Sequence, residues 1–176
     1  AHPTVVGTTA LGLQNADRSA IAGGRLLVSN GLTVAVSTLE ARLPKQTTKT
    51  TVGAHGAIAF DGTHLFATTS DFGSVLAYPV GEDGAIGTAG QPVPVREGTR
   101  SLHVTSLVRH GDQLYGSGPG AFVSYGLTDP MLPEQVAIDA VSEAELSGND
   151  DLRLRQLVPA GAARLIGPGR TLSVVD

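Results

Sequence analysis

Two short stretches, "GSVLAYPV" at residues 73–80 and "GAFVSYGL" at residues 120–127, follow the same pattern. Each begins with glycine, continues through small and apolar residues, and reaches a tyrosine at the sixth position. Because alternate residues of a strand point to opposite faces, a small residue between two apolar ones predicts a strand with a neighbouring sheet close to one face. The same arrangement surrounds Ala35 in "LTVAVSTL" and Ser173 in "RTLSVVD", so the pattern occurs four times.

A second predicted strand precedes each of these strands. Its markers are four apolar pairs, Leu26-Leu27, Leu65-Phe66, Leu114-Tyr115 and Leu165-Ile166. Three of the pairs follow a glycine by three residues, which predicts a tight turn, and a further apolar stretch lies before that turn. The pairs recur at intervals of roughly 40–50 residues, as blades of a repeat protein do.

A fourth strand is predicted after each small-centred strand. The stretches 43–52 and 132–141 share leucine, proline, glutamine and a final valine, and 90–95 takes this place in the second unit. Residues 133–147 also fit a helix with Pro133 near its start and Gly148 after its end. We favour the strand, because the matching segment 44–52 is rich in threonine, a poor helix former.

Repeated units of four antiparallel strands are typical of the blades of a β-propeller. We predict an all-β fold with blades at about 17–52, 53–95, 101–141 and 152–176, the last one completed by residues 3–12. This arrangement closes a ring of four blades. Two alternatives stay open: a fragment of a propeller with six to eight blades, and a two-sheet sandwich, which the repeat disfavours.

The segment "DGTHLFATTSDFGSVLAYPVGEDGAI" at 61–86 resembles the blades of bacterial propellers of the YVTN and lactonase type. It has the same order of a turn, a strand ending in small polar residues, a second strand and an acidic turn with glycine. The resemblance covers the second predicted blade well and the third less fully. It implies a propeller that binds ligands at the mouth of its central channel, and it implies no particular reaction.

Composition excludes several classes of protein. The chain has 176 residues, 41% of them hydrophobic, which suits one globular domain. The net charge is −4 and the basic residues are scattered, so we expect no nucleic-acid partner. Apolar runs are too short for a membrane span. The absence of cysteine excludes disulfides, thiolate metal sites and a cysteine nucleophile.

The first residue is alanine, which is consistent with the removal of a signal peptide and equally with an expression boundary. We predict an extracytoplasmic protein, either periplasmic or secreted.

The first strand of each blade lines the channel, so polar residues where these strands start are candidate ligand contacts. This rule selects Asp17 and Arg18, His55, His103 (or Val104), and Arg153 or Arg155. A guanidinium group matches the oxygens of a carboxylate or phosphate, so a ring of such groups can bind an anion. Ordinary polarity at solvated strand ends is the alternative explanation.

Metal and cofactor chemistry have weak support. Two histidines and one aspartate without a fixed ligand spacing are a poor metal signal, and we expect no metal and no cofactor. The acidic loop 147–151 lacks the alternating oxygen ligands of a calcium loop. No G-x-S-x-G motif occurs, and "GSGPG" at 116–120 lacks the lysine and helix that a phosphate loop needs.

We therefore predict a non-enzymatic binding or assembly module that presents its faces and loops to a protein or a small ligand. The partner could also be the remainder of a larger propeller. The alternative is an extracytoplasmic lactonase-like hydrolase that acts at the central mouth. Polar side chains that converge at one rim would favour the hydrolase, and a flat apolar patch would favour the binding module.

Overall fold

The computed structural model describes residues 10–40, 43–119, 121–140, 158–159, 165–168 and 172–175. Regular structure in these ranges consists of β-strands, with no helix among them. The segment 134–140, for which the sequence also allowed a helix, is a strand.

Three sheets have four antiparallel strands each, and the strands follow one another in chain order. The first sheet contains β1 (Arg18–Ala22), β2 (Arg25–Ser29), β3 (Thr33–Glu40) and β4 (Leu43–Thr51). The second contains β5 (His55–Phe60), β6 (His64–Thr69), β7 (Ser74–Pro79) and β8 (Val93–Pro94). The third contains β11 (Ser106–His110), β12 (Gln113–Gly118), β13 (Ala121–Gly126) and β14 (Glu134–Ala140).

Two smaller sheets complete the described structure. A short hairpin of β9 (Arg96–Glu97) and β10 (Arg100–Ser101) connects the second sheet to the third. The last sheet has three short strands, β15 (Val158–Pro159), β16 (Leu165–Pro168) and β17 (Leu172–Val175).

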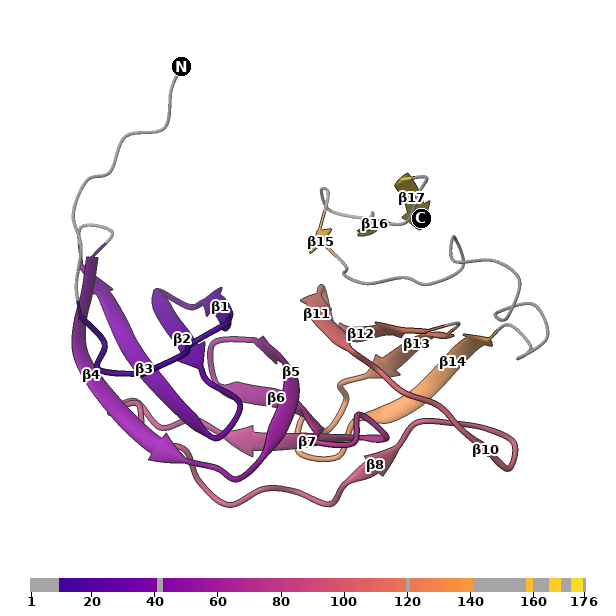
Figure 1. Ribbon diagram of the computed structural model, residues 1–176, viewed down its shortest axis with the longest axis horizontal. Coiled ribbons are helices and arrows are strands. Elements are labelled where there is room, and N and C mark those ends of the chain that lie inside the picture. The colour runs from indigo at the N-terminus through magenta and orange to yellow at the C-terminus, as the bar shows by residue number, and fades with distance from the viewer. Residues whose placement is uncertain are drawn as a thin grey trace.

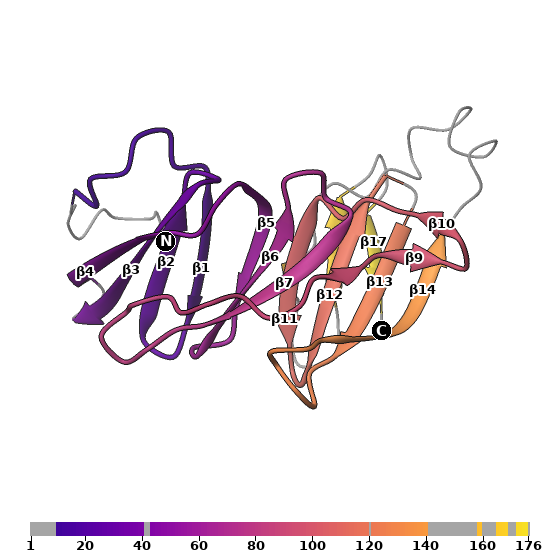
Figure 2. The ribbon, with the colours of Figure 1, turned by 90° about the horizontal axis from the view of Figure 1, so that it is seen from below.

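The three large sheets follow one another along an arc (Figure 1). Their first strands β1, β5 and β11 lie on the concave side, where β1 and β11 both contact β5. The view turned by 90° shows the sheets side by side, with β4 at one end of the row and β14 toward the other (Figure 2). Antiparallel four-stranded sheets repeated in this way are the blades of a β-propeller, which confirms the predicted fold class.

Strand pairing confirms the repeat in the second strands and corrects it in the first unit. Leu26 pairs with Ser37, Leu65 with Tyr78 and Leu114 with Tyr125, so the three leucines occupy one equivalent position. The sequence comparison placed Ala35 of β3 at the position equivalent to Ala77, and this assignment is wrong by one residue. Val36 pairs with Leu27 as Ala77 pairs with Phe66, so valine takes the central place in this sheet. Val34, Ala35 and Val36 are all buried, so the sequence pattern does not indicate on which face of the sheet each side chain lies.

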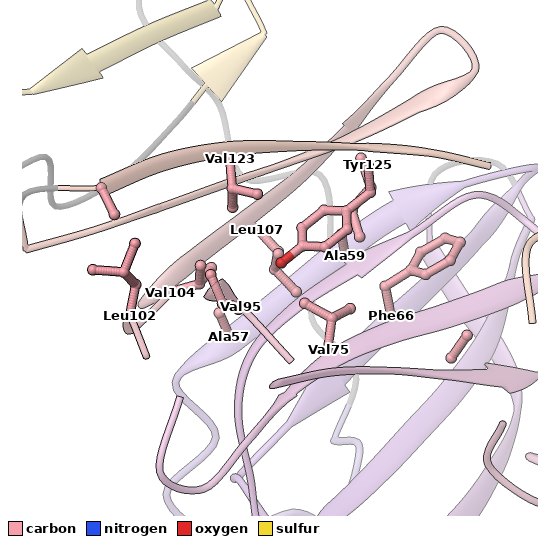
Figure 3. Packing of buried hydrophobic residues seen from close by; sticks show 13 residues of the cluster. Ala57, Ala59, Phe66, Val75, Val95, Leu102, Val104, Leu107, Val123 and Tyr125 are labelled. Atoms are coloured by element: carbon pink, nitrogen blue, oxygen red, sulfur yellow. The ribbon is translucent and has the colours of Figure 1, made fainter. Parts of the chain in front are cut away.

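Side chains from facing sheets form two apolar cores. Between the first and second sheets, Leu27, Val34 and Val36 pack against Ile58, Phe60 and Leu65. Between the second and third, Phe66, Val75 and Ala77 pack against Leu114, Val123 and Tyr125 (Figure 3). Neighbouring residues such as Leu65 and Phe66 therefore enter different cores. Full burial of each such side chain contributes about 1.5–3 kcal/mol.

Most of the predicted closing strand, residues 3–12, lies outside the described residues. Residues 10–12 are described and are not in a strand. There the Lys49 ammonium of β4 donates a hydrogen bond of 3.1 Å to the carbonyl of Gly12. The number of blades, their boundaries and the closure of the ring remain predictions.

Two turns on neighbouring sheets meet through their backbones. Gly23 and Gly24 form the two-residue turn between the paired residues Ala22 and Arg25, and their φ angles are 56° and 69°. Positive φ at both central positions is the geometry of a type I′ hairpin turn. A Cβ on Gly23 would lie 3.2 Å from the Cα of Gly62, in the first turn of the second sheet, whereas a Cβ on Gly24 would meet nothing within 4 Å.

We predict that Gly23→Ala destabilises the protein more than Gly24→Ala. Both variants place alanine in the left-handed region, which costs about 1–2 kcal/mol. Only Gly23→Ala also puts a methyl group against the Gly62 backbone. Chemical denaturation of the two variants measures the difference. Equal losses of unfolding free energy would show that the close approach of the turns contributes nothing.

Candidate functional site

In the second and third sheets, the backbone at or just before the first strand is bonded to a turn of the preceding sheet. The His55 amide donates to the carbonyl of Gly31 at 2.9 Å, and the Val104 amide donates to the carbonyl of Phe72 at 2.9 Å. Gly31 and Phe72 both have positive φ, 82° and 60°. His55 and Val104 are therefore equivalent residues at two successive junctions between sheets.

The His55 side chain closes the first of these junctions. Its Nδ1 donates to the carbonyl of Gly53 at 2.8 Å, which leaves Nε2 to accept the Ser29 hydroxyl at 2.6 Å. Ser29 Oγ in turn accepts the Gly31 amide at 2.9 Å. A carbonyl can only accept, so Nδ1 carries a proton, and in the neutral imidazole Nε2 is then the acceptor of the Ser29 hydroxyl.

Burial is the largest influence on His55 and lowers its pKa below the ordinary value of 6.5. The hydrogen bond to Gly53 and the charge of Asp17 oppose this shift, and the charge of Arg18 adds to it. A serine bonded to a neutral histidine resembles a nucleophile with its base. Ser29 is fully buried and His55 is only 5% exposed, so no substrate reaches this pair and its role is structural.

Three hydroxyl residues hold the same position in the three large sheets. Ser29, Thr68 and Ser117 each follow the equivalent leucine of the second strand by three residues, and all are fully buried. The hydroxyls of Thr68 and Ser117 have no hydrogen-bond partner in the described part of the chain. At the second junction the position of His55 holds Val104, whose side chain offers no acceptor to Thr68.

The Phe72 ring lies against β5 of its own sheet. A Cβ on Gly56 would overlap this ring and would lie 2.5 Å from Thr68 Oγ1. Only glycine therefore fits at position 56. Phe72 itself has a left-handed backbone, which is uncommon for a bulky residue.

A groove of about 540 Å³ lies on the concave side of the arc. Its walls are the first strands of the three sheets, through residues 17–21, 57–60 and 105–109. Arg18 Nη1 lies 3.0 Å from Asp17 Oδ1. Arg109 is exposed, and no described residue forms an ion pair or hydrogen bond with its side chain. The described lining therefore contains two guanidinium groups and one carboxylate, which favours an anion.

The structure brings some of the predicted site residues together and separates others. Asp17 and Arg18 line the groove. The His55 side chain is buried at the junction between the first and second sheets, and His103 is exposed ahead of β11. Neither imidazole lines the groove. Arg153 and Arg155 lie outside the described residues. Within the described ranges, no three histidine or carboxylate side chains converge as metal ligands would.

Sequence reasoning missed Arg109, which stands near the end of the first strand "SLVRH". The search for ligand contacts was confined to the residues where these strands start. The available signal was an arginine directly after the apolar pair Leu107-Val108 in a strand of the channel wall.

A second hollow of about 590 Å³ lies on the outer side, between β8 and β14. Its apolar wall is formed by the exposed Leu132 and by Pro92, Pro94 and Pro133. The carboxylates of Asp129 and Glu134 also line this hollow. It lacks the guanidinium groups of the concave groove.

We found no match to a protein-family model or to a curated protein. Solved structures do match. A protein of Lactobacillus plantarum has a TM-score of 0.59 at 14% identity, over 89% of this chain and 49% of its own. A Bacteroides uniformis protein provisionally named 6-phosphogluconolactonase has a TM-score of 0.60 at 14% sequence identity. The match covers 89% of this chain and 51% of that protein. Glutaminyl cyclase of Myxococcus xanthus has a TM-score of 0.54 at 16% sequence identity. The match covers 87% of this chain and 60% of that protein.

These similarities show the fold alone. The neighbours include lactonase-type propeller proteins, which supports the propeller type without selecting one family of repeats. The chain spans about half the length of the first two structures. Among its described residues, no helical segment has the length and apolarity needed to cross a bilayer.

We predict opposite effects on stability for two equivalent hydroxyl positions. Ser29→Ala removes the donor to His55 and the acceptor of the Gly31 amide, so it should cost about 1–3 kcal/mol of unfolding free energy. Thr68→Val removes a buried hydroxyl without a partner and should leave the stability unchanged or raise it by roughly 1 kcal/mol. Urea denaturation of both variants is the measurement. Losses of the same size at both positions would contradict the different roles of the two hydroxyls.

We also predict a loss of stability in mild acid that depends on His55. Its pKa is lower in the folded than in the unfolded chain, so the unfolded chain takes up this proton first as the pH falls. The unfolding free energy should be constant above about pH 6.5 and decrease below it until folded His55 is protonated as well. His55→Gln should flatten this part of the profile, whereas His103→Gln, at an exposed site, should preserve it. A profile that survives His55→Gln would assign the effect to other groups.

Proposed function

We propose that this protein is a binding module that takes a small carboxylate- or phosphate-bearing ligand in the concave groove. One observation carries the proposal: three successive sheets contribute their first strands to a single groove, and its Arg109 has no acidic partner among the described residues. The volume, about 540 Å³, suits a small molecule.

The two guanidinium groups contribute differently. Arg18 is paired with Asp17, and its side chain is 28% exposed. Arg109 lies two strands away on β11 with its donors open to solvent. A bound oxyanion would therefore be recognised first by Arg109, and the exposed Ser19 of β1 adds a hydroxyl to the same groove.

Titration with inorganic phosphate and acetate, followed by calorimetry, tests the proposal, with glucose as the uncharged control. Arg109→Gln should weaken binding of the anions about tenfold or more, because a hydrogen bond to a charged group contributes about 1.5–3 kcal/mol. Arg96→Gln makes the same charge change on β9, outside the groove, and should leave binding unchanged. Anion binding that is absent, or equally strong in Arg109→Gln, would contradict the proposal.

A lactonase-like hydrolase in the same groove is the competing hypothesis. It would need a group that activates water, and Asp17 is the carboxylate among the described lining residues. That carboxylate is already paired with Arg18, which favours binding over catalysis. Opening of an added sugar lactone, abolished by Asp17→Asn, would establish the hydrolase instead.

A further inference from the structure

Two contacts join the second and third sheets on either side of the outer hollow between β8 and β14. Ahead of it in the chain, a Cβ on Gly90 would overlap the carbonyl oxygen of Met131, so the two backbones touch there. Beyond it, the side-chain amide of Gln135 donates to the Arg96 carbonyl at 2.8 Å and accepts the Arg96 amide at 3.2 Å. Both walls lie between these contacts along the chain, so the hollow is a fixed feature of the fold.

The walls of the outer hollow offer apolar surface and few backbone donors. Pro92 and Pro94 flank Val93 on β8, and Pro133 comes directly before β14. Because proline has no amide hydrogen, two of the three residues at this edge cannot donate to an added strand. Leu132 adds an apolar side chain that is 54% exposed. A compact apolar group therefore fits the hollow better than an extended peptide bound through its main chain.

The described lining of the outer hollow includes two carboxylates and no basic side chain. Asp129 Oδ1 accepts the Met131 amide at 2.9 Å, which fixes this carboxylate in the turn before β14. Glu134 is the first residue of β14 and is exposed. Neither carboxylate forms an ion pair with a described residue. Two negative charges beside an apolar wall complement a positive charge carried by an apolar molecule.

The outer hollow and the concave groove consequently prefer ligands of opposite charge. The groove has the guanidinium groups of Arg18 and Arg109 with the single carboxylate of Asp17, whereas the hollow has carboxylates alone. The hollow has a volume of about 590 Å³, which is in the usual range for small-molecule sites. The two sites are independent, and the inference for the hollow does not rest on the ligand proposed for the groove.

We propose that the outer hollow binds a small organic cation, in which an ammonium group is attached to an aliphatic chain. The aliphatic chain lies against Leu132 and the prolines, and the ammonium group lies beside Asp129 and Glu134. Burial of a methylene group against such a wall raises the affinity up to about fourfold. The affinity therefore increases with the length of the aliphatic chain as well as with the positive charge.

Titration of the ¹⁵N-labelled protein with hexylammonium near neutral pH, followed by nuclear magnetic resonance, tests the proposal. The amide signals of Val93, Leu132 and Gln135 should shift and saturate. Butylammonium should bind about tenfold more weakly, because it lacks two methylene groups. Hexanoate, which has the opposite charge, and methylammonium, which lacks the aliphatic chain, should give no saturable shift of these signals.

Charge variants test the role of the carboxylates. Asp129→Asn keeps an oxygen for the Met131 amide and removes the charge, and Glu134→Gln removes the second charge. Each should raise the dissociation constant of hexylammonium about two- to fivefold while the circular dichroism is unchanged, and the double variant should raise it about tenfold. Glu82→Gln is the matched control, because Glu82 is exposed in a turn of the second sheet outside the hollow.

Leu132→Ser tests the apolar wall and should reduce the difference in affinity between butylammonium and hexylammonium. Shifts confined to the amides of the concave groove, or an unchanged dissociation constant in the double charge variant, would overturn the proposal. Light scattering tests the other occupant. Twice the chain mass of 17.9 kDa, reduced to the single mass by Leu132→Ser, would assign the hollow to a second copy of the chain and would also overturn it.

Discussion

Packing of each sheet against its neighbours is the interaction on which the rest of this structure depends. A four-stranded sheet with apolar residues on both faces needs another sheet on each side. Leu65 and Phe66 show this need directly, because one enters the core with the first sheet and the other enters the core with the third. Because each sheet packs on its neighbours, the successive sheets form an arc. The first strands of the three large sheets, β1, β5 and β11, then line one groove.

The two junctions between the large sheets share a backbone hydrogen bond and differ in their side chains. At the first, Ser29 and His55 form a buried polar pair. At the second, Val104 takes the place of His55 and belongs to the apolar core, and the Thr68 hydroxyl is left without a described partner. A histidine near the channel rim can thus serve the architecture, and its proximity to a serine is no sign of catalysis when both are buried.

The sequence was sufficient to predict what is local in the chain. Strands and turns follow from patterns within one unit, and the equivalence of Leu26, Leu65 and Leu114 follows from comparing the units. The pairing confirms both. The face of Ala35 could not be predicted, because both of its neighbours are also buried.

The candidate site was harder to predict for a related reason. His55 was placed at the correct end of its strand, but the direction of its side chain depends on Ser29, a residue of another sheet. Arg109 contributes to the groove only through the curvature of three sheets, which no single unit encodes. Long-range packing thus decided what the local pattern left open.

The crowding around Gly56 has a consequence for how this sequence can diverge. The space that a side chain would need there is filled by the Phe72 ring and the Thr68 hydroxyl, from two other parts of the same sheet. A larger residue at 56 becomes acceptable only after both neighbours have become smaller, so the order of substitutions matters. In homologous chains, positions 56, 68 and 72 should consequently change together, as one epistatic unit.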